Sequence, residues 1–208
     1  MIVAVDGPAA SGKGTIARAL ARHYGLPHMD TGLLYRAVAL NLLRWDGDPD
    51  SEFSAARACD FAQVDFADPE LKSEAVGGIA SRISAYPLVR QALVERQRAF
   101  AGQAGGAVLD GRDIGTVIAP EADAKLFVIA SPEVRAQRRF DELARIGLPA
   151  HYEEVLADIR ARDERDSTRA AAPLVPARDV LILDTSRMTV EQAVSAAIAA
   201  VASRVGTG

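Results

Sequence analysis

The sequence predicts an α/β protein in which five parallel strands form one sheet between two layers of helices. Apolar β-forming runs alternate with amphipathic segments along the 208 residues. Each apolar run is continuous and does not alternate with polar residues, which indicates strands that are buried on both faces. A glycine-rich loop joins the first apolar run to the first helical segment, and this order is typical of a three-layer α/β protein.

Five apolar or extended segments are the expected strands. The first is IVAV at residues 2–5, and LPHMDTG at 26–32 is a short extended piece. The runs AVLD, AKLFVIAS and VLILD complete the set at residues 107–110, 124–131 and 180–184. We expect the last of them to be a buried strand, because it is as apolar as the others.

The helical segments carry apolar residues at spacings of three and four. We expect helices over residues 13–24, 33–45, 51–63, 70–86, 87–103, 132–147, 148–169 and 189–205. The first ends at Gly25, a residue type that favours helix C-termini. The second has Leu34, Val38 and Leu42 on its inward face, and the charged segment 111–123 is expected to be a loop.

Local sequence also predicts the start of one helix and the inward face of another. Ser131 is expected to cap the helix that begins with Pro132, because serine accepts from the first free amides and proline suits the first position. In the C-terminal helix the expected inward positions are Val190, Val194, Ala197, Val201 and Val205.

Charge and composition divide the chain into a core and two additions, which together are expected to form a single domain over 1–208. The core is predicted to comprise residues 1–50, 87–134 and 170–208. A compact helical insertion is expected at about 51–86, and two charge-dense helices at about 135–169 are typical of a hinged flap.

Composition excludes several classes of function. The formal net charge of −4 does not favour a nucleic-acid-binding face. The single Cys59 cannot form an intramolecular disulfide, and the three histidines lack the spacing of zinc ligands. The sequence shows neither a secretory leader nor an apolar run of membrane-spanning length. We expect a cytoplasmic monomer with no membrane or nucleic-acid partner.

The motif with the most specific chemistry is GPAASGKGT at residues 7–15. In G-x-x-x-x-G-K loops, backbone amides surround phosphate oxygens, the helix N-terminus adds positive potential, and the lysine contacts the outer phosphates. A glycine turn could instead serve only to connect strand to helix, but the position between an apolar strand and a helix favours phosphate binding. The expected ATP-binding residues are Gly7, Pro8, Ala9, Ala10, Ser11, Gly12, Lys13, Gly14 and Thr15. The fold is therefore predicted to be a three-layer P-loop fold.

The residue after the loop lysine departs from the usual motif. Gly14 occupies the position where Ser or Thr ordinarily contacts magnesium, and Thr15 follows it. We therefore predict Mg²⁺ as the cofactor that accompanies ATP, with no direct protein ligand and with contacts from Thr15 and Asp110 through water. A structural role is the alternative for Asp110.

Arginines and carboxylates that follow the predicted strands indicate a second, anionic substrate. Arginine suits this role because its planar fork pairs with two phosphate oxygens. Arg36, Arg112 and Asp113 follow strand ends, where ligands bind in open α/β sheets. A further cluster lies in the charge-dense flap, where solvated ion pairs are the alternative explanation.

The segments GPAASGKGT, DTGLLYRA, VRQAL, VLDGRDIGTVI and RDERDSTRAAAPLVPA resemble the bacterial cytidylate kinases, and the similarity extends over essentially the whole chain. The resemblance implies that residues 51–86 are the part that binds the nucleoside monophosphate and that residues 135–169 are the lid. The CMP-binding residues that it implies are Thr31, Arg36, Ser81, Arg90, Arg112, Asp113, Arg162, Asp166 and Arg169.

The implied reaction is transfer of the γ-phosphoryl group of ATP to CMP or dCMP. The residues expected to carry catalysis are Lys13, Arg36, Arg112 and Arg169. Because the acceptor phosphate is already ionised, positioning and charge neutralisation suffice without a general base. One alternative is a P-loop kinase for UMP, AMP or shikimate, but the DGRDIGT and RDERDSTR segments do not favour it. The other alternative is a non-catalytic nucleotide-binding switch.

Overall fold

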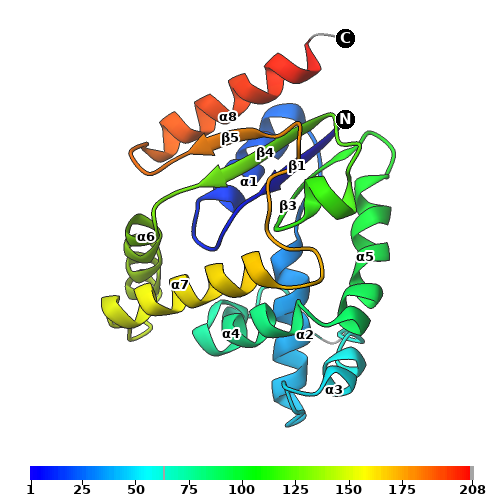
Figure 1. Ribbon diagram of the computed structural model, residues 1–208, viewed down its shortest axis with the longest axis vertical. Helices are drawn as coiled ribbons and strands as arrows, with labels where there is room; N and C mark the ends of the chain where they lie inside the picture. The colour runs from blue at the N-terminus through cyan, green and yellow to red at the C-terminus, as the bar shows by residue number, and fades with distance from the viewer. Residues whose placement is uncertain (63, 207–208) are drawn as a thin grey trace.

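The computed structural model describes residues 1–62 and 64–206 and contains one five-stranded sheet (Figure 1). The strands are β1 (Ile2–Asp6), β2 (His28–Asp30), β3 (Ala107–Gly111), β4 (Ala124–Ile129) and β5 (Leu181–Asp184). Their order is β2-β3-β1-β4-β5, and every described pair is parallel. The predicted five-stranded parallel sheet is confirmed.

Helices cover both faces of the sheet. On one face, α1 (Lys13–Tyr24) and α8 (Val190–Val205) share an apolar cluster with β1 and β4. On the other face, α5 (Pro87–Ala101) and the short turn η2 (Ile114–Ile118) pack against β1 and β3. Burial on both faces explains why the central strands are continuous apolar runs. No described helix has both the length and the apolar character needed to cross a membrane.

The insertion is helical, as expected, but its helices are shorter than predicted. It contains α3 (Glu52–Arg57), the 3₁₀ turn η1 (Pro69–Lys72) and α4 (Glu74–Ile83), which pack with α2 (Thr31–Arg44) in one apolar cluster. The expected helix over 70–86 is interrupted because the Ser73 hydroxyl accepts from the amide of Val76 and starts a new helix. The expected helix over 51–63 ends at Arg57, and its last position, Gln63, lies outside the described residues.

The segment expected to be the lid contains two helices, α6 (Pro132–Arg145) and α7 (Tyr152–Thr168), which have an apolar cluster of their own. Ser131 caps α6 as predicted, since its hydroxyl accepts from the amide of Val134 at 3.3 Å. Figure 1 shows α6 and α7 beside the sheet edge, with α7 lying next to α4 of the insertion.

Two burial predictions are wrong. β5 is an edge strand that pairs only with β4, and the side chain of Ile182 is 62% exposed. In α8 the expected inward residues Ala197 and Val201 are buried, as is Ala193, and Val205 packs against the same cluster, whereas Val190 is 59% exposed. Ile182 is exposed because the sheet ends at β5, where one face of the strand lacks a covering layer. Val190 is the first residue of α8 and lies before the part of the helix that packs against the sheet.

A further difference concerns residues 111–123, which were expected to form a loop. Ile114–Ile118 instead form a π-helical turn, in which the amides of Val117 and Ile118 donate to the carbonyl of Asp113. A single turn of this length leaves little periodicity for a sequence pattern to reveal.

Leu20→Ala should lower the free energy of unfolding by about 2–5 kcal/mol, because Leu20 is fully buried between α1 and the sheet. Ile182→Ala, at the exposed edge, is the matched control and should change it by about 0.5 kcal/mol or less. Urea denaturation of both variants measures the difference. Equal losses would contradict the assignment of β5 as an open edge.

Candidate functional site

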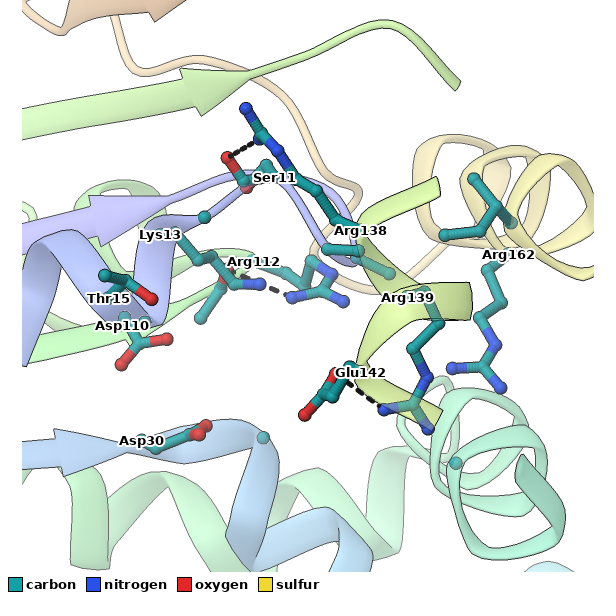
Figure 2. A pocket seen from close by; sticks show the side chains of 18 of the residues that line it. Ser11, Lys13, Thr15, Asp30, Asp110, Arg112, Arg138, Arg139, Glu142 and Arg162 are labelled. Atoms are coloured by element: carbon teal, nitrogen blue, oxygen red, sulfur yellow. Dashed lines mark hydrogen bonds and ion pairs between the residues drawn. The ribbon is translucent and has the colours of Figure 1, made fainter. Parts of the chain in front are cut away.

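A cavity of about 900 Å³ lies at the carboxyl edge of the sheet, between the glycine loop, the insertion and the lid (Figure 2). The predicted site residues that line it are Ala9, Ala10, Ser11, Gly12, Lys13, Gly14, Thr15, Thr31, Arg36, Ser81, Arg90, Arg112, Asp113, Arg162, Asp166 and Arg169. Among the described residues of the loop, Gly7 and Pro8 do not line it. Residues from five separate stretches of the chain thus meet in one place.

The loop between β1 and α1 has the backbone geometry that its glycines permit. Gly7 has a φ of +153°, and a Cβ at this position would lie 2.1 Å from the carbonyl oxygen of Val128. Gly12 has a φ of +92° and precedes α1 without a side-chain cap, which leaves the first amides of the helix facing the cavity. This arrangement suits an anion.

Lys13 is the loop residue with the strongest electrostatic perturbation. Its Nζ donates to the carbonyl oxygen of Pro8 at 3.2 Å. Burial, followed by the nearby Arg112 guanidinium, lowers the pKa of Lys13 to about 8. An anion bound beside Lys13 would oppose both effects and keep the ammonium charged.

Two carboxylates lie opposite the loop, at equivalent positions on neighbouring strands. Asp30 of β2 is in register with Asp110 of β3, and Asp110 Oδ1 lies 2.7 Å from Nε2 of His28. Burial and then the charge of Asp110 raise the pKa of Asp30. Asp110 Oδ2 also lies 3.5 Å from the position that a Cβ on Gly14 would occupy. Asp30 belongs to the polar cluster that ends β2, in which the expected site residues were Thr31 and Arg36.

These carboxylates and the exposed Thr15 hydroxyl are oxygen groups of the kind that magnesium prefers. In the part of the chain that the structure describes, no group of three or more His, Cys, Asp or Glu side chains is placed to hold a metal ion. The donor set therefore fits an ion carried mainly by substrate phosphates and water, as Mg²⁺ usually is.

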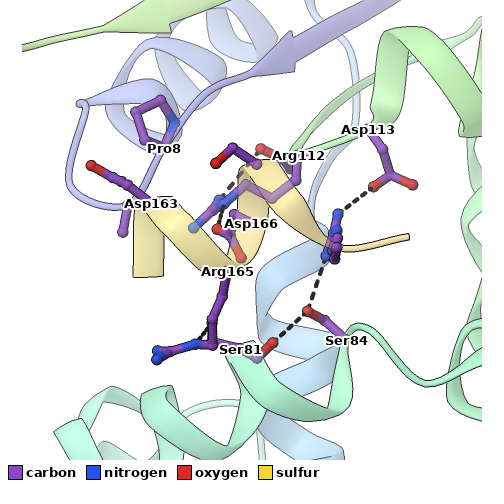
Figure 3. A network of polar contacts seen from close by, with 12 residues as sticks. Pro8, Ser81, Ser84, Arg112, Asp113, Asp163, Arg165 and Asp166 are labelled. Atoms are coloured by element: carbon purple, nitrogen blue, oxygen red, sulfur yellow. Dashed lines mark hydrogen bonds and ion pairs between the residues drawn. The ribbon is translucent and has the colours of Figure 1, made fainter. Parts of the chain in front are cut away.

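The segment after β3 forms an ion-pair network with the insertion and the lid (Figure 3). Arg112 Nε donates to Asp166 Oδ2 at 2.7 Å, which joins this segment to α7. Arg90 Nη2 donates to Asp113 Oδ2 at 2.5 Å, and both side chains are less than a tenth exposed. Arg169 Nη1 donates to the Ser84 hydroxyl at 3.0 Å.

Arginines on the insertion side are held together despite their like charges. Arg36 Nη1 donates to the carbonyl oxygen of Leu71 at 2.7 Å. Burial, and then repulsion by Arg162 and Arg139, lower the pKa of Arg36 to about 10. A phosphate in this cavity would therefore bring favourable charge.

Glu74 joins both lid helices to the insertion. Its carboxylate accepts from Arg139 of α6, and its Oε2 accepts from Arg162 Nη2 of α7 at 2.8 Å. Burial is the largest single effect on Glu74 and raises its pKa. The combined effect of Arg162 and Arg139 is larger, so the pKa of Glu74 is lowered overall. Glu74 therefore stays ionised between Arg139 of α6 and Arg162 of α7.

The sequence patterns missed several lid contacts of the loop. Arg138 Nη1 donates to the Ser11 carbonyl oxygen at 3.2 Å, and Arg138 Nη2 donates to the Thr185 carbonyl oxygen at 2.8 Å. Arg135 Nη1 donates to the Ala9 carbonyl oxygen at 3.2 Å. The three- and four-residue spacing of Arg135, Arg138 and Arg139 was a usable signal, because such positions share one face of a helix.

Two buried guanidinium nitrogens have no hydrogen-bond partner within the described residues: Arg162 Nε and Arg169 Nη2. Unpaired buried donors are unfavourable. Both residues line the cavity, so an anionic ligand with several oxygen acceptors would satisfy them.

A phosphate loop that faces arginines from an insertion and a lid, across one cavity, defines the class of P-loop phosphotransferases with a phosphate-bearing acceptor. The chain belongs to the cytidylate kinase family: the model of that family, described as Cytidylate kinase, matches residues 3–203.

Relatives named Cytidylate kinase support the assignment over nearly the full length. The protein of Xanthobacter autotrophicus (strain ATCC BAA-1158 / Py2) is 58% identical over 207 residues, covering 98% of each chain. That of Caulobacter sp. (strain K31) is 57% identical over 199 residues, covering 94% of this chain and 91% of the relative. An uncharacterized protein from Eubacterium ventriosum ATCC 27560, whose crystal structure is known, has a TM-score of 0.57 at 15% identity and covers 98% of this chain and 99% of its own. This last similarity concerns the fold alone.

The lowered pKa of Lys13 predicts a pH dependence of stability. Between about pH 8 and 10.5 the folded protein has released a proton that the unfolded chain still holds, so the contribution of Lys13 to stability rises with pH across this window. Lys13→Met should remove a rise of about 3 kcal/mol, measured by denaturation on either side of the window. Lys72→Met, at an exposed lysine, controls for the loss of one charge.

Glu74→Gln should loosen the lid, because it weakens charged hydrogen bonds to both lid helices. We expect amide hydrogen exchange in α6 and α7 to accelerate by about fivefold or more. Glu133→Gln, which removes an exposed pair with Arg160, is the control and should have little effect. Similar exchange in both variants would contradict the assigned role of Glu74.

Proposed function

We propose that this chain transfers the γ-phosphoryl group of ATP to CMP, and also to dCMP, giving the nucleoside diphosphate and ADP. The observation that carries the proposal is a phosphate loop and acceptor-side arginines lining one cavity, in a chain of the cytidylate kinase family. The names of relatives at 57–58% identity support CMP as acceptor. Extension to dCMP is our inference from the family resemblance.

The donor nucleotide occupies the loop side of the cavity. The amides of residues 9–15 and the N-terminus of α1 surround its phosphates, and Lys13 contacts the outer ones. Gly7 and Pro8 contribute through the loop backbone shape and not as cavity-lining groups. Arg138, which donates to the Ser11 carbonyl, holds the lid against this loop.

The acceptor nucleotide occupies the side formed by α4, the β3 end and α7. Arg36 and Arg112 hold its phosphate, and Arg169 neutralises charge near the transferring group. Thr31, Arg90 and Asp113 read the base, whereas Ser81, Arg162 and Asp166 approach the ribose. The buried Arg90–Asp113 pair supports a specificity role, because two fixed, desolvated groups penalise a base that does not match them.

Transfer requires no general base, because an acceptor phosphate oxygen is already a nucleophile at neutral pH. The chain contributes by aligning the two substrates and by placing cations around the reacting phosphates. The lid excludes water, which suppresses hydrolysis of ATP. Mg²⁺, when bound with ATP, supplies further charge neutralisation, and Thr15 and Asp110 would hold it through water.

The division of the chain follows from the same roles. Residues 1–50, 87–134 and 170–208 form the core, about 51–86 bind the nucleoside monophosphate, and about 135–169 form the lid. The separate apolar cluster of α6 and α7 supports the lid as a unit that moves by itself. A monomeric state and a cytoplasmic location stay predictions.

A coupled assay that measures ADP formation tests the function. ATP is supplied with CMP, dCMP, UMP, AMP or shikimate, each in turn. We expect CMP to support the fastest turnover, with dCMP next. A preference for UMP, AMP or shikimate would select another kinase of the same fold, and slow hydrolysis that no acceptor stimulates would select a nucleotide-binding switch.

Lys13→Ala should reduce kcat by about 100-fold or more, because the cation that meets the transferring phosphates is lost. Affinity for CMP, measured by calorimetry, should change much less, because Lys13 lies on the donor side. Retention of most activity would contradict the donor site, and equal loss of CMP binding would indicate a general disruption of the cavity.

A further inference from the structure

Asp6 is a buried carboxylate next to the cavity that has no role in the proposed mechanism. It is the last residue of β1 and directly precedes the glycine loop, and it is 5% exposed. Its Oδ1 accepts from the amide of Ile114 at 2.8 Å, and its Oδ2 accepts from the amide of Gly115 at 2.8 Å. One carboxylate therefore contacts the first two amides of η2, more than 100 residues away in sequence.

The first amides of a helical turn are ordinarily satisfied by the side chain of the residue that precedes it. That residue is Asp113, and aspartate is among the best residues for capping. Its side chain nevertheless makes no capping hydrogen bond. It is instead paired with Arg90 at 2.5 Å and lies 4.0 Å from Arg169 Nη2. Asp6 thus performs the capping that Asp113 would otherwise perform.

The close packing around η2 depends on this contact. A Cβ on Gly115 would lie 3.4 Å from Asp6 Oδ2 and 3.2 Å from Lys125 Cδ, so glycine permits the close approach. The carbonyl of Asp113 accepts from the amides of Val117 and Ile118. Both sides of the short segment that carries Arg112 and Asp113 are therefore fixed, by β3 before it and by the capped turn after it.

The charge of Asp6 does not serve the stability of the fold. Burial, which outweighs the two amide hydrogen bonds, raises the pKa of Asp6 to about 6 from 3.8. Because the folded pKa lies above the unfolded value, the contribution of this group to stability is largest below about pH 3.8 and falls as the pH rises through 6. An ionised Asp6 at neutral pH is thus retained against a stability penalty, which is typical of functional positions.

We infer that Asp6 is a positioning residue for the acceptor: it caps η2 in place of Asp113 and so leaves the Asp113 carboxylate free to pair with Arg90 and contact the acceptor nucleotide. The role deepens the proposed function and rests on it. Asp6 also connects the two proposed substrate sites. It is the last residue of β1, directly before the donor loop, and it fixes the turn that follows Arg112 and Asp113 on the acceptor side.

Asp6→Asn tests the inference with little change in side-chain volume. The side-chain oxygen of asparagine can replace only one of the two carboxylate oxygens as acceptor. Its NH₂ group presents a donor to the other backbone amide. Asp113 is then drawn back toward the uncapped amides. We expect kcat/KM for CMP to fall about tenfold or more, with KM for ATP changed about twofold or less, since an unsatisfied buried amide has an effect of this size.

Asp123→Asn is the matched control. Asp123 is an exposed carboxylate whose Oδ2 accepts from the amide of Ile2 at the other end of β1. This variant should leave both kinetic parameters close to those of the wild type. The melting temperature of Asp6→Asn should stay within a few degrees of the wild type at pH 7, because removal of a buried charge offsets the lost hydrogen bond.

A double-mutant cycle distinguishes positioning through Asp113 from a general structural role. If Asp6 acts through Asp113, then Asp6→Asn should add little to the loss in kcat/KM for CMP caused by Asp113→Asn. Additive losses, equal losses for ATP and CMP, or failure of Asp6→Asn to fold would each overturn the inference. A wild-type protein that forms no ADP in response to CMP would instead overturn the proposed function.

Discussion

The site depends on the uniformly parallel sheet. Since all described strand pairs are parallel, the carboxyl ends of β1, β2 and β3 meet at one edge. The glycine loop follows the end of β1, Asp30 is the last residue of β2, and the segment with Arg112 and Asp113 follows the end of β3. Reversal of any one strand would move its group to the opposite edge, about 10 Å away for the three-residue β2 and about 17 Å away for the five-residue β1 and β3. The position of the cavity therefore depends on the direction of the strands more than on any single side chain.

The charges in the cavity form a balanced but incomplete network. Carboxylates pair with several arginines, as in Arg112–Asp166 and Glu74–Arg162. Arg36 nevertheless has a pKa lowered to about 10, and Lys13 has a pKa lowered to about 8. Cations that are disfavoured in the free protein become favoured when phosphates enter. A bound phosphate would therefore offset the desolvation of these cations and, to a smaller extent, their mutual repulsion.

Lid and insertion are joined by charged groups that line the cavity. Arg162 and Arg139 reach Glu74 from different helices, and Arg138 reaches the carbonyl of Ser11 in the glycine loop. Phosphate oxygens compete with these acceptors for the same guanidinium groups. An anionic ligand in the cavity would therefore change the hydrogen bonds that join the lid to the insertion and to the glycine loop.

Sequence alone determined the layered α/β fold, the glycine loop and the Ser131 cap, because each depends on neighbouring residues and on local backbone geometry. Motif resemblance placed the site residues, and all but Gly7 and Pro8 line one cavity. The exposure of Ile182, the interrupted helix at Ser73, and the contacts of Glu74, Arg138 and Asp6 were decided by tertiary structure. Sheet edges and long-range hydrogen bonds depend on which segments meet in space, and such meetings leave no periodic pattern in the sequence. The capping of Ile114 and Gly115 by Asp6 is the clearest case, because a local pattern would have assigned it to Asp113.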